Sequence, residues 1–514
     1  MRYALISAAL LLGANLAQPA LAQKPSDLVA EAVKAEGGAD ALRALKSYSV
    51  KGEAKFWEPG QSMAAGGEPR CLGTAMFAMS VDLANGMART EWDRDQQYPP
   101  PAEKLKYTEV VEPKLGFVID EKGASKPMSA IRVAAELREM WRAAPTLLLK
   151  AMDAKDLAAA NNQTLGKQSL PAVSFVAGGN TFIVLFDPRS HLPAAIRSRD
   201  DDNIAGDSNY DLVPSDWKAV AGVQMPQTLS YRLNGLEVAH ISIKDETANP
   251  NLTADLFNVP DAIKSAAKAP ATSGVPFQWV IRRLFLARFL DSDNIIFPDG
   301  AGLKLVELAP NVLHVEGGTA NHLIVNMKDG LLIVDAPYGE LQSRWTIDAV
   351  KQKFPGKPIK VLVLTHHHMD HTGGTRTFIA EGAQVIVPAP DKAYFEKVAR
   401  TTHTIVPDAL QKNPKAARIS EVKDQQVIKD DTEEVRLYNI PNPHVKGMFF
   451  VYLPKENIAY VTDLVSPRGK IDRSDNTIAF GEALRKYGIT GATIAGGHGN
   501  TTKQSEIEPA LAKN

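Results

Sequence analysis

Cysteine is almost absent from this chain of 514 residues, in which Cys71 is the only one. A single thiol cannot form an intramolecular disulfide, and thiolate ligation of zinc is excluded unless Cys71 itself takes part. Because Cys71 lies far in sequence from the other candidate ligands, we interpret it as a structural or incidental thiol. A metal site in this chain is therefore expected to use histidine and carboxylate ligands.

An excess of charge of one sign is also missing. The 58 Lys and Arg residues nearly balance the 59 Asp and Glu residues, which gives a net charge of -1. A chain with so little net charge has no positive electrostatic field that would attract a polyanion, so nucleic acid is a poor candidate partner. With 44% hydrophobic residues and no long apolar run after the first residues, the mature protein is expected to be globular without a transmembrane segment. Its length exceeds what one hydrophobic core normally serves, so two domains are expected.

The first 22 residues have the features of a secretory signal peptide. Arg2 supplies a positive charge before the apolar stretch Ala4–Leu16, which is too short to span a bilayer comfortably. Ala20-Leu21-Ala22 then gives a small-x-small cleavage pattern. We therefore predict that residues 1–22 are removed and that the mature protein is periplasmic or secreted.

Residues 24–260 are predicted to form a β-rich domain. Helical patterns occur at Ser26–Leu45 and Ala134–Met152, and alternating segments separated by turn signals such as Asn234-Gly235 are typical of antiparallel strands. The alternating segments include Tyr48–Ala54, Thr181–Phe186 and Thr228–Leu233, with a weaker one at His240–Lys244.

The turn and strand-end residues of this half weakly resemble those of periplasmic lipoprotein-carrier-like domains. The similar segments are Phe186-Asp187-Pro188 with His191-Leu192-Pro193, Gly222-Val223-Gln224-Met225-Pro226 and Leu256-Phe257-Asn258-Val259-Pro260. The resemblance implies a half-barrel, in which a curved antiparallel sheet wraps a helix. Its concave face could hold an acyl chain or another apolar ligand.

A linker and an amphipathic segment follow this half. Residues 261–275 are rich in Ala, Lys, Ser and Pro without a sustained pattern, which favours a linker. The segment Phe277–Leu290 is aromatic and basic; it could lie on a membrane surface, but we favour packing between the two domains. Residues 276–514 form the second predicted domain. Its four opening strand patterns, helical patterns at Trp345–Lys353 and Asp391–Arg400, and later alternation of strand and helix indicate an αββα sandwich of two sheets with helices outside.

The strongest chemical signal is the segment Val361–Gly374, VLVLTHHHMDHTGG. Its apolar start predicts a strand buried on both faces, and four histidines and an aspartate follow within seven residues. His366 and His368 are two residues apart, so on an extended chain both imidazoles face one side and can reach one ion. Asp370 and His371 follow on the turn and can face a neighbouring ion.

Three single residues further along the chain also lie beside the end of an apolar strand. His444, Asp463 and His498 each lie at or beside the end of an apolar strand pattern. Loops at strand ends are where α/β proteins place their sites. These residues are therefore candidate ligands from separate parts of the domain.

The order His366-x-His368-x-Asp370-His371, then His444, Asp463 and His498, resembles the metallo-β-lactamase fold superfamily over about Leu305–Ile507. The resemblance implies two Zn²⁺ ions per chain, one held by His366, His368 and His444. The other would be held by Asp370, His371 and His498, with Asp463 bridging both. Asp335 matches an aspartate that closes an early strand beneath the metals, where it would accept from a ligand's imidazole N–H or brace the loop.

This resemblance predicts a metallo-hydrolase with a C-terminal αββα sandwich of fold class α/β, and the weaker resemblance of the first half predicts an antiparallel, β-rich, half-barrel-like α+β domain before it. Zinc lowers the pKa of bound water to about 7, so a metal-bridging hydroxide could cleave an ester, thioester, lactone or lactam. Asp370 would be catalytic, ligating one ion and orienting the hydroxide. The substrate is expected to be a small molecule, possibly with an acyl or apolar part. Neither the scissile bond nor the oligomeric state follows from the sequence.

Other interpretations stay open. A β-lactamase acting on antibiotics is one, but the position of Asp463 is a cysteine in one major group of zinc β-lactamases and is not a ligand in another. Two-iron relatives replace one of these histidines by glutamate, so the complete set favours zinc. A lipid-binding periplasmic protein with an inactive metal domain is a third alternative. His367 is expected to point away from the ligands, the role of His403 is open, and a fragment from Val275 onward is expected to hold metal alone.

Overall fold

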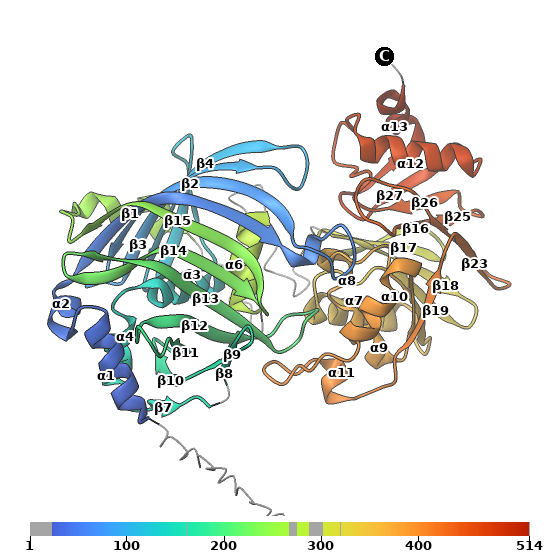
Figure 1. The fold of residues 1–514 in the computed structure, drawn as a ribbon. Coiled ribbons are helices and arrows are strands. Elements are labelled where there is room, and N and C mark those ends of the chain that lie inside the picture. Colours follow the sequence, from blue (N-terminus) through green and yellow to red (C-terminus); the bar gives the residue numbers. More distant parts are fainter. Residues whose placement is uncertain (1–22, 162, 267–274, 287–301, 319, 513–514) are drawn as a thin grey trace, which may run out of the picture.

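The computed structural model describes residues 23–161, 163–266, 275–286, 302–318 and 320–512 (Figure 1). The predicted signal peptide, most of the predicted linker and the end of the Phe277–Leu290 segment lie outside these residues. The described chain forms two parts, a large antiparallel sheet followed by a two-sheet sandwich.

The N-terminal part is built on one 13-stranded sheet in which the paired strands are antiparallel. The sheet order is β6-β5-β4-β3-β2-β1-β15-β14-β13-β12-β11-β10-β7, and β8 pairs with β9 separately. In chain order the strands are β1 (Ser47–Glu58), β2 (Arg70–Asp82), β3 (Met87–Gln96), β4 (Glu103–Glu112), β5 (Leu115–Asp120), β6 (Ser125–Pro127), β7 (Ala158–Ala159), β8 (Gln163–Leu165), β9 (Gln168–Leu170), β10 (Ala172–Ala177), β11 (Asn180–Phe186), β12 (Pro193–Asp200), β13 (Ser208–Val220), β14 (Val223–Leu233) and β15 (Leu236–Ala248).

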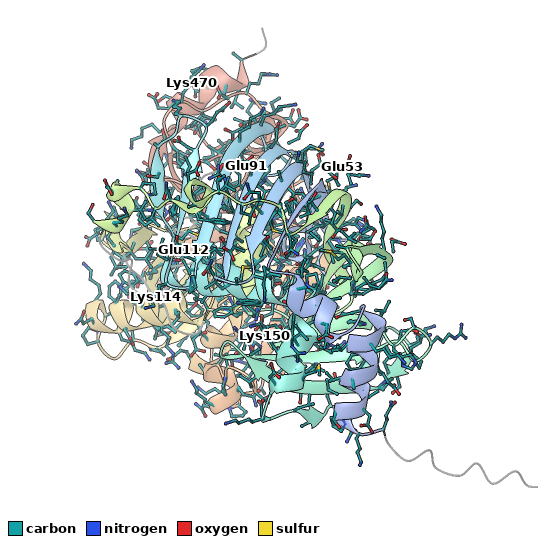
Figure 2. All side chains as sticks on the ribbon, turned by 90° about the vertical axis from the view of Figure 1, so that its left-hand side faces the viewer. Glu53, Glu91, Glu112, Lys114, Lys150 and Lys470 are labelled. Carbon is teal, nitrogen blue, oxygen red and sulfur yellow. The ribbon has the colours of Figure 1, made fainter. Side chains whose placement is uncertain are left out.

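The alternation of side chains explains how this sheet is covered. Along β1 the buried residues Val50, Ala54 and Phe56 alternate with exposed ones, because successive side chains point to opposite faces. Glu53 on β1 and Glu91 on β3 project from the outer face (Figure 2). The predicted β-rich antiparallel domain is thus confirmed, with an apolar inner face.

Each of the two helical patterns of this part forms two helices rather than one. The first gives α1 (Pro25–Ala35) and α2 (Ala39–Ala44), because Gly37 and Gly38 between them have φ values of +120° and +93°. The second gives α3 (Ala130–Ala143) and α4 (Leu147–Asp153), separated at Pro145, which cannot donate a helical hydrogen bond. The turns η1 (Pro59–Gln61) and η2 (Ala254–Phe257) complete this part.

The predicted interdomain segment forms α6 (Phe277–Leu286), preceded by the single turn α5 (Asp261–Lys264) within the predicted linker. Trp279 and Val280 of α6 are buried in one apolar cluster with Ile131 of α3 and with Tyr338 and Met369 of the C-terminal part. The prediction that this segment packs between the two parts is therefore confirmed. None of the helices in the described ranges is long and apolar enough to cross a membrane.

A cavity of about 210 Å³ lies between the inner face of the N-terminal sheet and the helices α3 and α6. Its lining is mainly apolar and includes Phe56, Trp92, Met140, Tyr231 and Phe285.

The C-terminal part is the expected αββα sandwich. One sheet has the order β16-β17-β18-β19-β20-β21-β22 and the other β23-β24-β25-β26-β27-β28. The strands are β16 (Lys304–Ala309), β17 (Val312–Glu316), β18 (His322–Met327), β19 (Gly330–Val334), β20 (Ile359–Val363), β21 (Gln384–Pro388), β22 (Arg418–Val422), β23 (Gln425–Lys429), β24 (Glu434–Asn439), β25 (Phe449–Leu453), β26 (Ile458–Val461), β27 (Thr493–Gly496) and β28 (Thr501–Lys503). The helices are α7 (Glu340–Lys353), α8 (Met369–Thr372), α9 (Thr375–Glu381), η4 (Ala389–Asp391), α10 (Lys392–Val398), α11 (Ala409–Lys412), α12 (Asp475–Lys486) and α13 (Gln504–Leu511).

Three apolar clusters define the layers of this sandwich. The inner cluster joins Leu332 and Val363 of the first sheet to Val451 and Tyr460 of the second. Separate clusters lie between the first sheet and α7, α9 and α10, and between the second sheet and α12. Strands β19 and β20 are parallel; β19 is buried along its whole length, which explains its continuous apolar sequence, and β20 is interrupted only by the exposed Lys360 and the half-buried Val361.

Candidate metal centre

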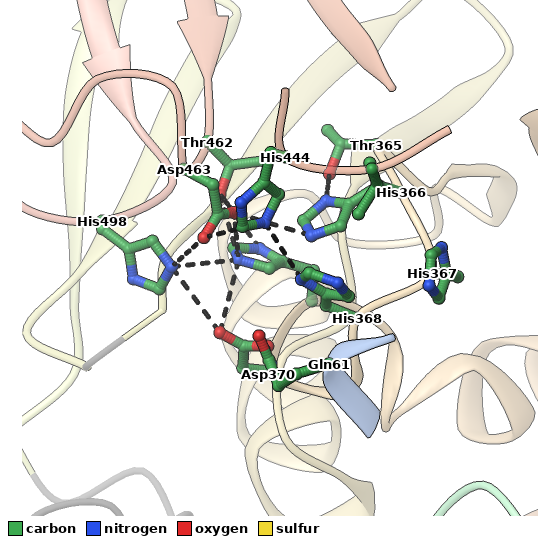
Figure 3. A network of polar contacts seen from close by, with 12 residues as sticks. Gln61, Thr365, His366, His367, His368, Asp370, His444, Thr462, Asp463 and His498 are labelled. Carbon is green, nitrogen blue, oxygen red and sulfur yellow. Dashed lines mark hydrogen bonds and ion pairs between the residues drawn. The ribbon is translucent and has the colours of Figure 1, made fainter. Parts of the chain in front are cut away.

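The histidine-rich segment begins directly after β20, where the chain leaves the sheet. His366 and His368 precede α8, and Asp370 and His371 lie within it. His444, Asp463 and His498 arrive from loops next to β25, β26 and β27. All seven predicted ligands converge in one place, at loops and a short helix next to strand ends of both sheets (Figure 3).

The first group consists of His366, His368 and His444, which are all buried. Nε2 of His444 lies 3.0 Å from Nδ1 of His368. Nε2 of His366 is buried without a hydrogen-bond partner among the described residues, 3.6 Å from Oδ2 of Asp463. A cation would satisfy these facing nitrogen lone pairs.

The second group consists of Asp370, His371, Asp463 and His498. Nε2 of His371 lies 3.1 Å from Nε2 of His498 and 3.0 Å from Oδ2 of Asp463. Oδ2 of Asp370 is 3.6 Å from both of these imidazole nitrogens. Oδ1 of Asp463 also lies 3.5 Å from Nε2 of His444, so its carboxylate lies between the two groups.

Both groups fit zinc in spacing and in ligand chemistry. Tetrahedral zinc with bonds of 2.0–2.1 Å to nitrogen separates its ligand atoms by about 3.3 Å. The paired imidazole nitrogens lie 3.0 and 3.1 Å apart in the two groups. Histidine and carboxylate ligands without a thiolate are also a normal zinc set.

Burial sets the protonation of the first group. It lowers the pKa of His366 and His368 well below the usual value and that of His444 to about 4. These imidazoles are therefore neutral at pH 7, the form that binds metal.

Carboxylates set the protonation of the second group. Burial opposes the charged form of His371, but Asp463 and Asp370 outweigh it and raise the pKa of His371 well above its usual value. Burial likewise opposes ionised Asp463, but His444, His371 and His498 hold the pKa of Asp463 well below its usual value. A cation binding here would replace the proton on His371, since ligation requires neutral imidazole.

Asp335 connects the motif to the sheet below it. Its Oδ1 accepts from the backbone N–H of Thr365 at 2.8 Å, and its Oδ2 accepts from the Tyr460 hydroxyl at 3.1 Å. Oδ2 also lies 3.2 Å from Nδ1 of His371. Asp335 thus has both contacts expected of it, since it accepts from an imidazole and braces the loop.

Asp335 and Asp463 share an unusual backbone conformation. Their φ values are +70° and +55°, a region that costs a non-glycine residue energy and often occurs at functional sites. The backbone N–H of Asp335 donates to the carbonyl oxygen of Val363 at 2.7 Å, and the carbonyl oxygen of Asp463 accepts from Nδ2 of Asn476 at 3.1 Å.

The two remaining histidines of interest lie outside both ligand groups. His367 points away from His366 and His368, as expected, and its Nε2 lies 2.9 Å from the carbonyl oxygen of Ser62 (Figure 3). His403 is buried with Nδ1 2.9 Å from Oδ1 of Asp201. Both histidines therefore contact the N-terminal part.

Sequence reasoning missed the contribution of the N-terminal part to this centre. Gln61, Ser62, Arg70 and Tyr98 all contact the ligand residues or their backbone. They belong to no motif, and no predicted pattern marked the turn that carries Gln61 and Ser62.

Comparisons with known proteins agree with this geometry. Residues 316–506 match the family model of the metallo-beta-lactamase superfamily. A segment of 78 residues, 15% of the chain, is 36% identical to 12% of an (R)-specific secondary-alkylsulfatase from Pseudomonas sp.. A segment of 151 residues, 29% of the chain, is 26% identical to 43% of 2,4-dinitroanisole O-demethylase subunit alpha from Nocardioides sp. (strain JS1661). The chain thus spans less than half the length of these curated relatives.

Solved structures also resemble the chain. A metallo-beta-lactamase from Pontibacter korlensis aligns with 41% of this chain and 97% of its own, at 20% identity and a TM-score of 0.31. A sec-alkylsulfatase from Pseudomonas sp. aligns with 42% of this chain and 43% of its own, at 18% identity and a TM-score of 0.32. The C-terminal part of the chain has the metallo-β-lactamase fold, and its residues 316–506 are those that match the superfamily model.

Proposed function

We propose that the protein is a zinc-dependent hydrolase that cleaves an ester, thioester, lactone or lactam bond in a small molecule. The observation that carries this proposal is the convergence of two ligand groups with the carboxylate of Asp463 between them. The match of residues 316–506 to the metallo-beta-lactamase superfamily model supports a hydrolase.

Each ligand group would hold one of two zinc ions. His366, His368 and His444 would hold the first, and Asp370, His371 and His498 the second, with Asp463 shared. When bound, zinc supplies Lewis acidity that polarises the substrate and lowers the pKa of water to about 7. The neutral imidazoles of the first group preserve this acidity because they add no charge.

Asp370 is the proposed catalytic residue of the chain itself. Its Oδ1 accepts a hydrogen bond of 2.6 Å from Gln61, while its Oδ2 faces His371 and His498. Gln61 fixes Oδ1 by donating to one of its lone pairs. The second lone pair of Oδ1 can then accept a hydrogen bond from the attacking water and orient that water towards the substrate. Asp335 keeps His371 in place through Nδ1 and leaves Nε2 for the ion.

The substrate class is proposed to include an acyl or other apolar part. The apolar cavity between the N-terminal sheet and α6 supports this proposal, because α6 also contacts the segment that carries the ligands. The alkylsulfatase similar to part of the chain is named for an alkyl ester, which adds sulfate esters to the candidates. The same cavity favours the second candidate function, in which the N-terminal part binds a lipid.

The chain organisation is proposed as a signal peptide over residues 1–22, a β-rich domain over 24–260, a linker over 261–275 and the metallo-β-lactamase-fold domain over 276–514. The signal peptide would direct the protein to the periplasm or the exterior, as its charged start and small-x-small cleavage pattern indicate.

Metal analysis combined with a substrate panel tests the function. The purified mature protein should contain close to two zinc equivalents and should hydrolyse at least one of a chromogenic ester, thioester, lactone, cephalosporin or alkyl sulfate. Chelation should abolish that activity, and zinc should restore it. Undiminished hydrolysis by metal-free protein would contradict the proposal, whereas lipid binding without hydrolysis would favour the second candidate.

A further inference from the structure

The turn between β1 and β2 enters the metal centre from the N-terminal part. This β1–β2 turn, residues 59–69, begins with η1 and brings Gln61 beside Asp370 (Figure 3). The two residues are 309 positions apart in the chain. The contact therefore depends on the docking of the two parts rather than on local sequence.

Both ends of the Gln61 amide are used. Its Nε2 donates to Oδ1 of Asp370 at 2.6 Å, and its Oε1 accepts from the Tyr98 hydroxyl at 2.8 Å. Because a carboxylate only accepts, the Tyr98 hydroxyl must donate to the amide oxygen for both bonds to form. Gln61 is 3% exposed, so water does not compete for these bonds. The bond to a charged acceptor is the stronger kind of hydrogen bond.

The next residue acts on the first ligand group through its backbone. The carbonyl oxygen of Ser62 lies 3.0 Å from Nε2 of His368. A carbonyl cannot donate, so Nε2 of His368 must carry the proton. The lone pair of the neutral imidazole is then on Nδ1, the atom that lies 3.0 Å from Nε2 of His444. The N-terminal part thereby fixes the tautomer that a metal ligand at His368 needs.

The loop that carries His444 is held from the same side. Arg70 donates through Nη2 to the carbonyl oxygen of His444 at 2.7 Å and lies over the Tyr98 ring at 4.5 Å. The Tyr98 ring stacks near His444, with ring centroids 6.4 Å apart. Lys446 donates its backbone N–H to the carbonyl oxygen of Met63 at 2.9 Å.

The β1–β2 turn is itself anchored by buried charges. Glu58 accepts from the backbone N–H of Gly60 at 2.8 Å and pairs with Arg282 of α6, which also binds Asp202 at 2.7 Å. A Cβ at Gly60 would lie 3.2 Å from Cβ of Met369, so the turn lies directly against α8. The ion pairs and this close approach set the position of Gln61.

We propose that the N-terminal part is an integral component of the metal centre, with Gln61 as a positioning residue for Asp370 and the Ser62 carbonyl as the group that orients His368. The inference rests on the proposed metal function. It assigns to the β-rich part a role at the ions themselves, in addition to any substrate binding in its cavity.

Substitution of Gln61 in the full-length mature protein tests the proposal. Gln61→Met keeps the length and apolar stem but removes the hydrogen bond, so the affinity for the second zinc ion should fall about tenfold to hundredfold. The first ion, held by His366, His368 and His444, should keep its affinity. Competition with a chromophoric chelator gives both affinities, and cobalt(II) substitution gives an absorption spectrum that reports the changed ligand geometry without any substrate.

Two further variants separate positioning from folding. Tyr98→Phe keeps the ring against His444 but removes the hydroxyl that orients Gln61, so it should weaken the second ion in the same direction by a smaller factor. Gln168→Met makes the same substitution at an exposed position of β9 and should change neither affinity nor spectrum. With a hydrolysed substrate, Gln61→Met should lower kcat while KM stays within about twofold, since it alters a group that orients the attacking water rather than one that binds substrate.

The outcomes distinguish this inference from the proposed function. Wild-type protein that binds no metal would overturn both. Wild-type protein with two ions, and Gln61→Met and Tyr98→Phe proteins with the same affinities and the same cobalt spectrum, would overturn only the role of the N-terminal part. Weaker binding of the second ion by the folded Gln61→Met protein, with the Gln168→Met control unchanged, would establish it.

Discussion

At the scale of single residues, Asp463 determines whether the two ligand groups form one centre. Its two carboxylate oxygens face His371 on one side and His444 on the other. A carboxylate between two dications would offset their mutual repulsion. No other described carboxylate has such contacts with both groups.

Replacing Asp463 by Ala should therefore remove the second ion more readily than the first. The zinc content should fall from two equivalents towards one, and the rate should fall by about a hundredfold or more, because several kcal/mol of transition-state stabilisation are lost. Metal analysis after dialysis and steady-state kinetics measure the two effects. His444→Ala is the matched control and should weaken the first ion instead. Two tightly bound ions and near-normal turnover in Asp463→Ala would contradict a bridging role.

The buried carboxylate of Asp335 should matter for stability as well as for the site. In Asp335→Ala the backbone N–H of Thr365 loses its acceptor inside the protein, and the hydroxyl of Thr365 loses the carboxylate to which it donates. We expect the free energy of unfolding to fall by about 3 kcal/mol, the cost of leaving such buried donors unsatisfied. Chemical denaturation of the metal-free proteins measures this difference. Asp335→Asn, which keeps an acceptor oxygen, should lose less; equal losses would show that only the charge matters.

His322 gives the metal-free protein a defined pH dependence. It is fully buried on β18 beside Thr346, and burial, with a smaller effect from nearby His314, lowers the pKa of His322 from 6.5 to about 3. Because the folded pKa is the lower one, the stabilisation is complete above pH 6.5 and is lost as the pH falls towards 3.

Between pH 6 and 4 the wild-type protein should therefore lose up to about 1.4 kcal/mol more stability per pH unit than His322→Gln. Glutamine offers an acceptor to Thr346 but does not titrate. Urea denaturation of both metal-free proteins across this range gives the free energy of unfolding as a function of pH. If this free energy falls equally steeply with falling pH in both proteins, His322 is not buried in its neutral form.

At the scale of elements, the sequence predicted the strands with a clear local side-chain pattern, but it did not single out β2 to β10, β12 or β13. The apolar run before His366 predicted β20, and Asn234-Gly235 predicted the hairpin between β14 and β15, where both residues have positive φ. The helix breaks at Gly37 and Pro145 were missed because apolar spacing continues across them. The contact that requires glycine at position 37 comes from β14 and its preceding turn, which no local pattern reveals.

The break between α1 and α2 should be sensitive to a single methyl group. A Cβ at Gly37 would lie 2.1 Å from the carbonyl oxygen of Gly222, in addition to the strain of its positive φ. Gly37→Ala should therefore lower the free energy of unfolding by well over 1 kcal/mol. Gly38→Ala has positive φ but nothing within 4 Å of the added Cβ, so it should lose less. Thermal unfolding of the two variants compares the effects, and equal losses would refute the steric part.

At the scale of the whole molecule, the sequence indicated all seven candidate ligands but not their neighbours from the other part. Residue type and position beside apolar strands made these residues candidates, and the resemblance to the metallo-β-lactamase superfamily assigned them to two ions. Gln61 and Tyr98 do not, because ordinary polar residues become part of a site only through docking of distant segments. The same docking buries Trp279 of α6 against Met369 of α8.

This interface reverses the expectation for a fragment that begins at Val275. The fragment keeps every proposed ligand, but it lacks Gln61 and the Ser62 carbonyl and exposes the apolar face of α6 that contacts α3. We expect it to hold less than two zinc equivalents and to self-associate, as metal analysis and analytical ultracentrifugation would reveal. A monomeric fragment with two zinc ions would show that the ligand segment needs no partner.

The length of chain between Ser62 and His368 has a consequence for how the protein matures. Their hydrogen bond joins residues 306 positions apart, so Ser62 is synthesised long before the histidine that it orients. A chain in which only the β-rich part has been made or has folded contains Gln61 and Ser62 but no folded ligand group. Such a chain cannot bind the two ions. Because Gln61 of the same turn contacts Asp370 of the second ligand group, acquisition of the second ion then becomes a signature of completed folding, and the rate of its uptake during refolding should equal the rate at which the two parts dock.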